Sequence, residues 1–236
     1  MKILLIGNGQ MGTLIRKLAL DRGMVVADSF HTETIDRLKD FDQPADVLID
    51  FSSPQALPAI ADYIQKTKTP LVCGTTGYDE DARQQLAFLA TCAPVLYSTN
   101  FSAGIIIIRR ILREFSAYLL DNGFEAELIE AHHSQKQDVP SGTAKTLLSE
   151  IDPERRLQRV IGRRQQGTRG RQEIGIHSLR GGTEAGRHKV IFFGKDEQIE
   201  IAHSAESREI FARGALLGAE KLVRQDKGLY TFDQLI

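Results

Sequence analysis

Residues 2–12 read KILLIGNGQMG, and this stretch decides the fold. It opens with a mostly apolar run that ends in glycine, which is typical of a strand buried on both faces. Apolar residues then recur at helical spacing through residues 11–22, and Gly23 follows as a natural helix stop. A GxGxxG turn between a buried strand and a helix is the context in which such a turn binds a dinucleotide pyrophosphate.

Strands and helices alternate through the first hundred residues with short connections. This alternation predicts an α/β fold with a doubly wound parallel sheet, as in a Rossmann domain. Ser53 and Pro54 are suited to open one of the helices, as its cap and its first turn. The predicted strands are 2–7, 24–28, 45–51, 70–74 and 94–98, and the predicted helices are 11–22, 33–40, 53–66 and 79–91.

The pattern changes after Phe101, where a second α+β domain with an open mixed sheet is predicted. Two of its strands are separated only by the turn at 194–197, so they are antiparallel. The last helix, 207–224, is expected on the uncovered flank of the first sheet. The dinucleotide-binding domain would then comprise 1–101 and 207–236, and the substrate-binding and oligomerisation domain 102–206. The other expected elements are helices at 103–120 and from Gly142, and strands at 124–131, 174–179, 188–193 and 198–203.

Composition excludes several classes of protein. The net charge of −1 gives the molecule no field that would gather nucleic acid or an anionic membrane. The arginine-rich segment 153–172 could bind a polyanion, but it has no interleaved aromatic residues, which favours a flexible solvated loop. Two cysteines make neither a disulfide framework nor a four-ligand zinc site. Since no apolar stretch reaches membrane-spanning length, a cytoplasmic protein is expected.

Three further features lie where a cofactor of such a sheet would bind. Asp28 ends the second predicted strand and can accept hydrogen bonds from an adenine ribose. The loops GTTG at 74–77 and STNFS at 98–102 follow the fourth and fifth strands. Each loop alone could be an ordinary turn. Because the carboxyl ends of parallel strands share one edge of the sheet, together they favour a nicotinamide site.

The densest polar segment, at 130–143, reads EAHHSQKQDVPSGT. Its paired histidines could bind a metal, but no third ligand stands at a suitable spacing, so no metal site is predicted. A structural histidine is the alternative. A lysine and a glycine-opened helix start favour carboxylate binding, and a histidine that titrates near neutrality can deliver a proton.

This segment resembles the signature of the dihydrodipicolinate reductase family, also called the 4-hydroxy-tetrahydrodipicolinate reductases. The resemblance extends to IGIHSLRGG at 174–182 and HSAESREIFARG at 203–214. It implies that His132 is the general acid and that Lys136 is its catalytic partner. The substrate-binding residues that it implies are His133, Lys136, Ser141, Gly142 and Thr143. The cofactor-binding residues that it implies are Gly7, Gly9, Gln10, Met11, Gly12, Gly74, Thr75, Thr76, Ser98, Thr99, Asn100 and Phe101.

The resemblance also implies a reaction, in which NADH or NADPH reduces a cyclic dicarboxylate on the diaminopimelate route to lysine, and it implies a homotetramer. Gln10 stands where the family often has a basic residue, and Ser98-Thr99 stands where many members have Ala-Pro. We expect NADH to serve at least as well as NADPH, since no arginine is beside Asp28 in the sequence. The alternatives are another two-domain NAD(P)-dependent dehydrogenase and a non-catalytic NAD(P)H sensor.

Overall fold

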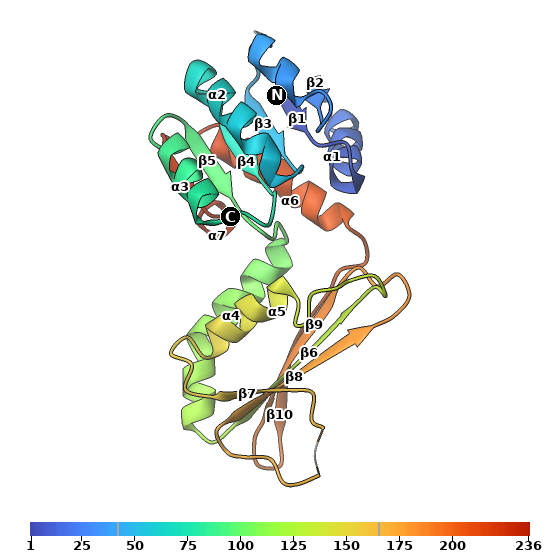
Figure 1. Cartoon of the computed structure of the whole chain (residues 1–236). Helices are drawn as coiled ribbons and strands as arrows, with labels where there is room; N and C mark the ends of the chain where they lie inside the picture. The colour runs from blue at the N-terminus through green and yellow to red at the C-terminus, as the bar shows by residue number, and fades with distance from the viewer. Residues whose placement is uncertain (42, 165) are drawn as a thin grey trace. The chain divides into compact units, whose positions relative to one another are not determined.

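The computed structural model describes residues 1–41, 43–164 and 166–236, which form two compact units. Unit 1 comprises Met1–Ser102 and Arg208–Ile236, and unit 2 comprises Ala103–Ser207 (Figure 1). The chain therefore leaves unit 1 once and returns to it. Within the described residues, no helix is long and apolar enough to cross a membrane.

Unit 1 contains a six-stranded parallel sheet in the order β11-β5-β4-β3-β1-β2. The order reverses at β1, because β2 lies on one side of it and β3 on the other. Ligands of such sheets bind outside the carboxyl ends of the strands at this reversal. The strands are β1 (Lys2–Ile6), β2 (Val25–Phe30), β3 (Val47–Asp50), β4 (Leu71–Cys73), β5 (Pro94–Tyr97) and β11 (Gly228–Tyr230).

Helices cover both faces of this sheet. On one face α2 (Leu57–Thr67) and α3 (Glu80–Leu89) bury a core that includes Leu4 and Leu48. On the other, α1 (Gln10–Asp21) packs against α6 (Glu209–Leu222), which also contacts β3, β4 and β5. The predicted doubly wound sheet is confirmed. The remaining helices are the short turns η1 (Ile35–Asp40) and η2 (Pro54–Ala56), both 3₁₀, and α7 (Phe232–Leu235).

Three expectations for unit 1 need correction, and one strand was not expected. The predicted helix at 33–40 is a 3₁₀ turn, and the helix predicted from Ser53 starts as a separate 3₁₀ turn without a cap bond from that serine. Strand β2 continues to Phe30, so Asp28 lies within the strand. The sixth strand, β11, was not predicted, because three residues carry too little periodicity to be recognised.

Unit 2 contains a five-stranded mixed sheet in the order β10-β9-β6-β8-β7. Strands β6, β8 and β7 are parallel, whereas β9 and β10 are antiparallel to their neighbours. Helices α4 (Ala103–Asp121) and α5 (Gly142–Ile151) cover one face and bury a core around Leu112, Leu128 and Leu147. The predicted open mixed sheet is confirmed. Its strands are β6 (Glu125–His132), β7 (Gln158–Ile161), β8 (Glu173–Arg180), β9 (Arg187–Phe193) and β10 (Gln198–Ser204).

Segment 153–172, predicted to be a solvated loop, contains the edge strand β7. Two of its arginines, Arg163 and Arg169, form ion pairs with Glu127 of β6. The strand has an exposed, non-alternating pattern, so its pairing with β8 comes from tertiary context. Residue 165 of this segment lies outside the described residues.

Candidate functional site

The glycine loop has the backbone geometry that dinucleotide binding requires. Gly7 has a φ of +109°, and a Cβ there would overlap the carbonyl of Phe51. A Cβ on Gly12 would overlap the carbonyl of Gly7, so the helix can start close to the strand only with glycine. Gly9 caps α1 without a side chain, and a Cβ there would meet no described atom within 4 Å. The loop is therefore closely packed at Gly7 and Gly12, whereas at Gly9 its backbone is open to an approaching pyrophosphate.

Buried polar groups hold the loops that follow β3 and β4. Asp50, at the end of β3, is fully buried and accepts bonds from Ser52 N (3.1 Å) and Cys73 Sγ (3.4 Å). Ser52 N also donates to Thr75 Oγ1 at 3.0 Å. Burial raises the pKa of Asp50, and its bonds to Ser52 and Thr75 oppose that change. Thr75 is itself buried, whereas Thr76 is exposed toward solvent.

The loop after β5 is stabilised by its own side chains. Ser98 Oγ donates to the carbonyl of Asn100 at 2.6 Å, and Asn100 Oδ1 accepts from Ser102 N at 2.8 Å. Phe101 is 2% exposed and packs between Phe51 and Phe232. Any cofactor contact of Phe101 would therefore come from its backbone, since its side chain belongs to the core.

An arginine is bonded to the residue that follows Asp28 on β2. Asp28 is exposed on β2, and its Oδ1 accepts from Ser29 N at 2.8 Å. The guanidinium of Arg16 donates to the hydroxyl of Ser29. Arg16 belongs to α1, so the fold brings it to a strand that follows it in the chain. Strand β2 therefore carries an exposed carboxylate at Asp28 and, one residue on, a hydroxyl bonded to a guanidinium.

In unit 2, His132 is buried at the end of β6 and is bonded to a carboxylate. Its Nδ1 lies 2.5 Å from Oε2 of Glu130, which is fully buried on the same face of the strand. Arg180 of β8 forms an ion pair with that carboxylate at 2.8 Å. Burial lowers the pKa of His132, the charges of Lys136 and Arg180 lower it further, and Glu130 opposes them. The pKa of Glu130 is also lowered: burial acts to raise it, but the bonds from Arg180 and His132 outweigh that.

The loop between β6 and α5 brings Lys136 and Gly142 to a single carboxylate. Asp138 accepts from Lys136 Nζ at 2.6 Å through Oδ1 and from Gly142 N at 3.2 Å through Oδ2. Burial acts to raise the pKa of Asp138, but the bond and charge of Lys136 hold it below its ordinary value. The side chain is 46% exposed. An ammonium and an amide at the start of a helix thus converge on one partly exposed carboxylate.

Ser141 has a structural role that its sequence position did not reveal. Its Oγ caps α5 by accepting from Ala144 N at 3.1 Å, and it lies 3.0 Å from His188 Nε2. Its N–H donates to Glu130 at 3.3 Å. Burial and the neighbouring His132 lower the pKa of His188 to about 4, so this ring is neutral near pH 7. At the start of α5, the N–H groups of Ser141, Gly142 and Ala144 each donate to a side chain of the protein.

The structure thus places His132, Lys136, Ser141 and Gly142 around one end of the unit 2 sheet. His133 and Thr143 are half-buried in the same segment. Sequence reasoning missed the residues that hold this group together, which are Glu130, Arg180 and His188. Only Glu130 carried a usable signal, because residues two apart on a strand share a face.

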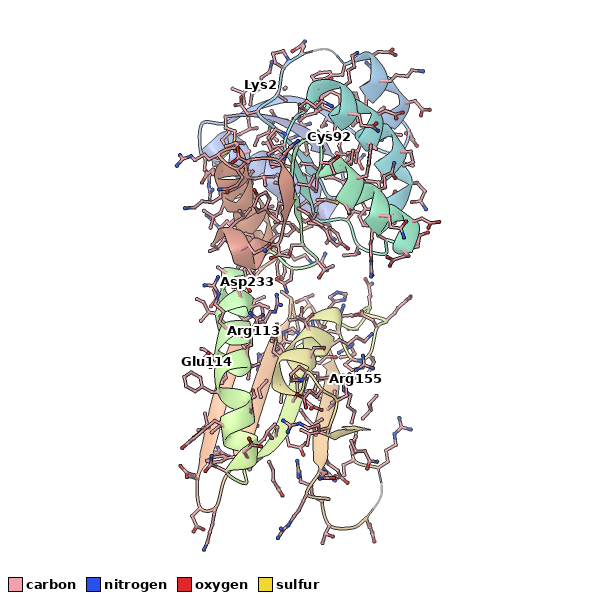
Figure 2. The ribbon with its side chains drawn as sticks, turned by 90° about the vertical axis from the view of Figure 1, so that its left-hand side faces the viewer. Lys2, Cys92, Arg113, Glu114, Arg155 and Asp233 are labelled. Carbon is pink, nitrogen blue, oxygen red and sulfur yellow. The ribbon has the colours of Figure 1, made fainter. Side chains whose placement is uncertain are left out.

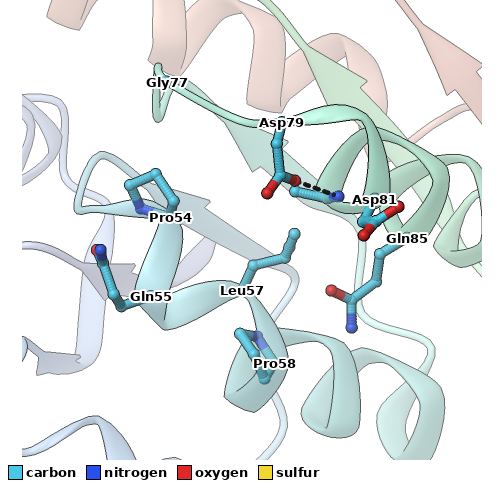
Figure 3. A pocket seen from close by; sticks show the side chains of 9 residues that line it. Pro54, Gln55, Leu57, Pro58, Gly77, Asp79, Asp81 and Gln85 are labelled. Atoms are coloured by element: carbon cyan, nitrogen blue, oxygen red, sulfur yellow. Dashed lines mark hydrogen bonds between the residues drawn. The ribbon is translucent and has the colours of Figure 1, made fainter.

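Two other features of the described residues do not add to this site. No group of three or more His, Cys, Asp or Glu side chains that could hold a metal occurs among them. A pocket of about 440 Å³ lies in unit 1, at the starts of η2, α2 and α3, and it contains none of the predicted site residues. Asp79 lies in its wall, where its carboxylate accepts from Ala82 N as the cap of α3 (Figure 3).

Comparison with known proteins covers the whole chain. Family models described as the N-terminus and the C-terminus of dihydrodipicolinate reductase match residues 1–101 and 104–236. The 4-hydroxy-tetrahydrodipicolinate reductase of Exiguobacterium sibiricum is 40% identical over 242 residues, covering 100% of this chain and 96% of that protein. The one from Staphylococcus saprophyticus is 41% identical over 245 residues, covering 100% of both.

A solved structure has the same fold over the full length. Dipicolinate-bound dihydrodipicolinate reductase from Paenisporosarcina sp. TG-14 superposes with a TM-score of 0.78 at 21% identity, covering 100% of this chain and 99% of that one. At that identity the likeness shows the fold alone, while the family models and the curated relatives show the lineage. This chain belongs to the dihydrodipicolinate reductase family.

Proposed function

We propose that this protein reduces 4-hydroxy-tetrahydrodipicolinate to tetrahydrodipicolinate with NAD(P)H, on the diaminopimelate route to lysine. The observation that carries the proposal is the carboxylate of Asp138, to which Lys136 and Gly142 both donate. His132 is buried in the same unit with Nδ1 bonded to Glu130. An anion subsite and a proton donor are what reduction of a dicarboxylate requires. The solved relative from Paenisporosarcina, which carries dipicolinate, supports the same substrate class.

The residues divide the chemistry between the two units. The backbone of Gly7, Gly9 and Gly12 would hold the pyrophosphate of the cofactor, whose nicotinamide supplies the hydride when bound. In unit 2, a substrate carboxylate would displace Asp138 from Lys136 and Gly142. His132, with Nδ1 engaged by Glu130, would use Nε2 to protonate the developing carbanion or enamine.

A coupled assay tests this proposal against its alternatives. The preceding synthase, given aspartate semialdehyde and pyruvate, makes the intermediate in the cuvette, and nicotinamide oxidation is followed by absorbance. Rapid oxidation that depends on the synthase supports the reductase. Oxidation with a different keto or imino substrate alone would indicate another dehydrogenase, and cofactor binding without turnover would indicate an NAD(P)H sensor.

Two glycine substitutions separate cofactor binding from folding. Gly9→Ala should leave the melting temperature unchanged, because its Cβ meets no described atom within 4 Å. It should raise the KM for NADH, because the methyl group would face the pyrophosphate in the proposed site. Gly12→Ala should lower both stability and affinity, since its Cβ overlaps the carbonyl of Gly7. Thermal melts and NADH titrations check this. An unchanged NADH affinity in Gly9→Ala would show that the pyrophosphate lies elsewhere.

The side chains of Asp28 and Arg16 lead to a prediction about the preference between NADH and NADPH. The carboxylate of Asp28 favours a free ribose hydroxyl, so NADH should serve at least as well as NADPH. Arg16 should assist a 2′-phosphate, and because it is exposed its effect is small. Arg16→Ala should lower kcat/KM for NADPH by about two- to fivefold and spare NADH. Lys17→Ala, whose ammonium faces Glu209 instead, is the control. A tenfold preference of the wild type for NADPH would contradict the role of Asp28.

We also propose a homotetramer built through the sheet of unit 2, in the cytoplasm. Leu179 (59% exposed) and Phe193 (39% exposed) lie on the sheet face opposite to Leu128 and Phe192, which pack under the helices. Exposed apolar residues on a sheet face are typical of an association surface. Both cysteines are free, which fits a reducing compartment. Light scattering on the purified protein measures the assembly.

A further inference from the structure

Glu130 is a buried carboxylate that the mechanism described above does not use directly. Both of its oxygens are bonded: Oε2 to His132 Nδ1 (2.5 Å) and Arg180 Nη1 (2.9 Å), and Oε1 to Arg180 Nη2 (2.8 Å) and Ser141 N (3.3 Å). The side chain has no solvent exposure. Burying a charge is costly even when it is paired, and an apolar pair often serves stability as well. Stability alone therefore does not explain why a carboxylate is buried at this position.

The bonds of Glu130 determine which nitrogen of His132 carries a proton at rest. Arg180 is always protonated and donates two bonds, so Glu130 is ionised and can only accept. His132 Nδ1 must then carry hydrogen, which leaves Nε2 as the atom that exchanges a proton. Gly186 keeps the approach to Nε2 open, because a Cβ there would lie 3.2 Å from that nitrogen.

Among the charges around His132, that of Glu130 favours the imidazolium. Lys136 of the loop and Arg180 of β8 are cations, and both disfavour a second positive charge. His188 of β9 faces the ring of His132 edge-on, with centroids 5.1 Å apart, and it offers no negative charge. Of the charged groups that most affect the pKa of His132 within the described residues, Glu130 is the anion and Lys136 and Arg180 are the cations.

We propose that Glu130, clamped by Arg180, is the positioning residue that keeps His132 protonated on Nδ1 and supplies the negative charge with which Nε2 holds the transferred proton. The inference rests on the proposed function, in which His132 is the acid. Arg180 also holds the loop that carries Lys136, the second catalytic candidate, because it donates to the carbonyls of Lys136 (3.3 Å) and Asp138 (2.7 Å). One ion pair thus orients both His132 and the loop that carries Lys136.

Glu130→Gln isolates the charge, because glutamine keeps the shape and an acceptor oxygen. At neutral pH, kcat should fall about 10- to 100-fold while the KM for NADH is unchanged. An acid must be protonated to act, so activity is lost as pH rises through the pKa of His132. Without the anion, that loss of kcat/KM should move to lower pH by about one unit or more. Lowering the pH should partly restore the variant.

Glu150→Gln is the matched control in the same unit. Glu150 is also a largely buried glutamate that binds two arginines, Arg109 and Arg113 of α4, but it has no histidine partner (Figure 2 labels Arg113). This variant loses one carboxylate charge and the same kind of ion pair. Its pH profile and kcat should match the wild type. A profile displaced equally in both variants would overturn the proposal, because any lost ion pair would then suffice.

NMR of the ligand-free protein tests the inference independently of the reaction. In the wild type, ¹⁵N shifts should show His132 protonated on Nδ1 when neutral, and its titration midpoint should fall in Glu130→Gln but not in Glu150→Gln. A wild-type Nε2–H tautomer, or an unmoved midpoint, would overturn the proposal even if the enzyme is active. If Glu130→Gln does not fold, Glu130→Gln with Arg180→Met removes both charges of the pair. Its midpoint should still lie below that of the wild type, but by less than in Glu130→Gln, because Arg180 also lowers the pKa of His132. Failure of the coupled assay with these NMR results intact would count against the proposed reaction alone.

Discussion

Replacement of His132 by glutamine is expected to lower kcat by about 10²- to 10⁴-fold, the usual contribution of general acid–base catalysis. Glutamine can still bond to Glu130, but it cannot deliver a proton from the position of Nε2. NADH affinity should be nearly unchanged, because the glycine loop and Asp28 belong to unit 1 and His132 to unit 2. Steady-state kinetics in the coupled assay, with NADH and substrate varied separately, measures both effects.

His177→Gln provides the control for that experiment. His177 lies on β8 of the same sheet and is also bonded to a glutamate, Glu127, at 2.9 Å, but it points to the opposite face from His132. Its replacement should leave kcat within about twofold, because its side chain lies on the sheet face away from His132. If His132→Gln retains kcat within threefold of the wild type, His132 is not the acid, and the proton must come from another group or from water.

Thr143→Val should raise the substrate KM by about 10- to 150-fold, since one hydrogen bond to a charged group is worth about 1.5–3 kcal/mol. Thr143 lies in the first turn of α5, next to the Gly142 amide that already binds a carboxylate. Valine keeps the shape of threonine and removes the donor. The bond is made in the ground state and in the transition state alike, so its loss should appear mainly in KM.

Inhibition by pyridine-2,6-dicarboxylate independently tests the proposed bond from the Thr143 hydroxyl to a carboxylate. The inhibition should weaken in Thr143→Val, while the KM for NADH changes little. Thr146→Val is the matched control, because its hydroxyl donates to the carbonyl of Gly142 within the same helix and is committed there. If Thr143→Val binds the planar dicarboxylate as tightly as the wild type does, the carboxylate is held by other groups and the assignment of Thr143 is wrong.

Local pattern was sufficient for much of the fold. Strand β1 and helix α1 are recognisable because a buried apolar run, a glycine turn and a helical repeat follow one another within residues 2–22. Strand β6 alternates buried and half-buried residues along its length, which matches the pleat of a strand with one covered face. Strands β7 and β11 escaped recognition, because short edge strands depend on their neighbours more than on their own residues.

The sequence by itself determined the family, the glycine loop and the segment that carries His132, Lys136 and Thr143, because these depend on residues close together in the chain. Only the tertiary structure decided which groups support them. Arg180 reaches Glu130 across 50 residues through the register of β6 and β8, and His188 reaches Ser141 across 47 residues. Arg16 meets Ser29 through the packing of α1 on β2. Periodicity and propensity report on neighbours along the chain, whereas charge and hydrogen bonding act through space, so a partner from another strand becomes visible only when the sheet is assembled.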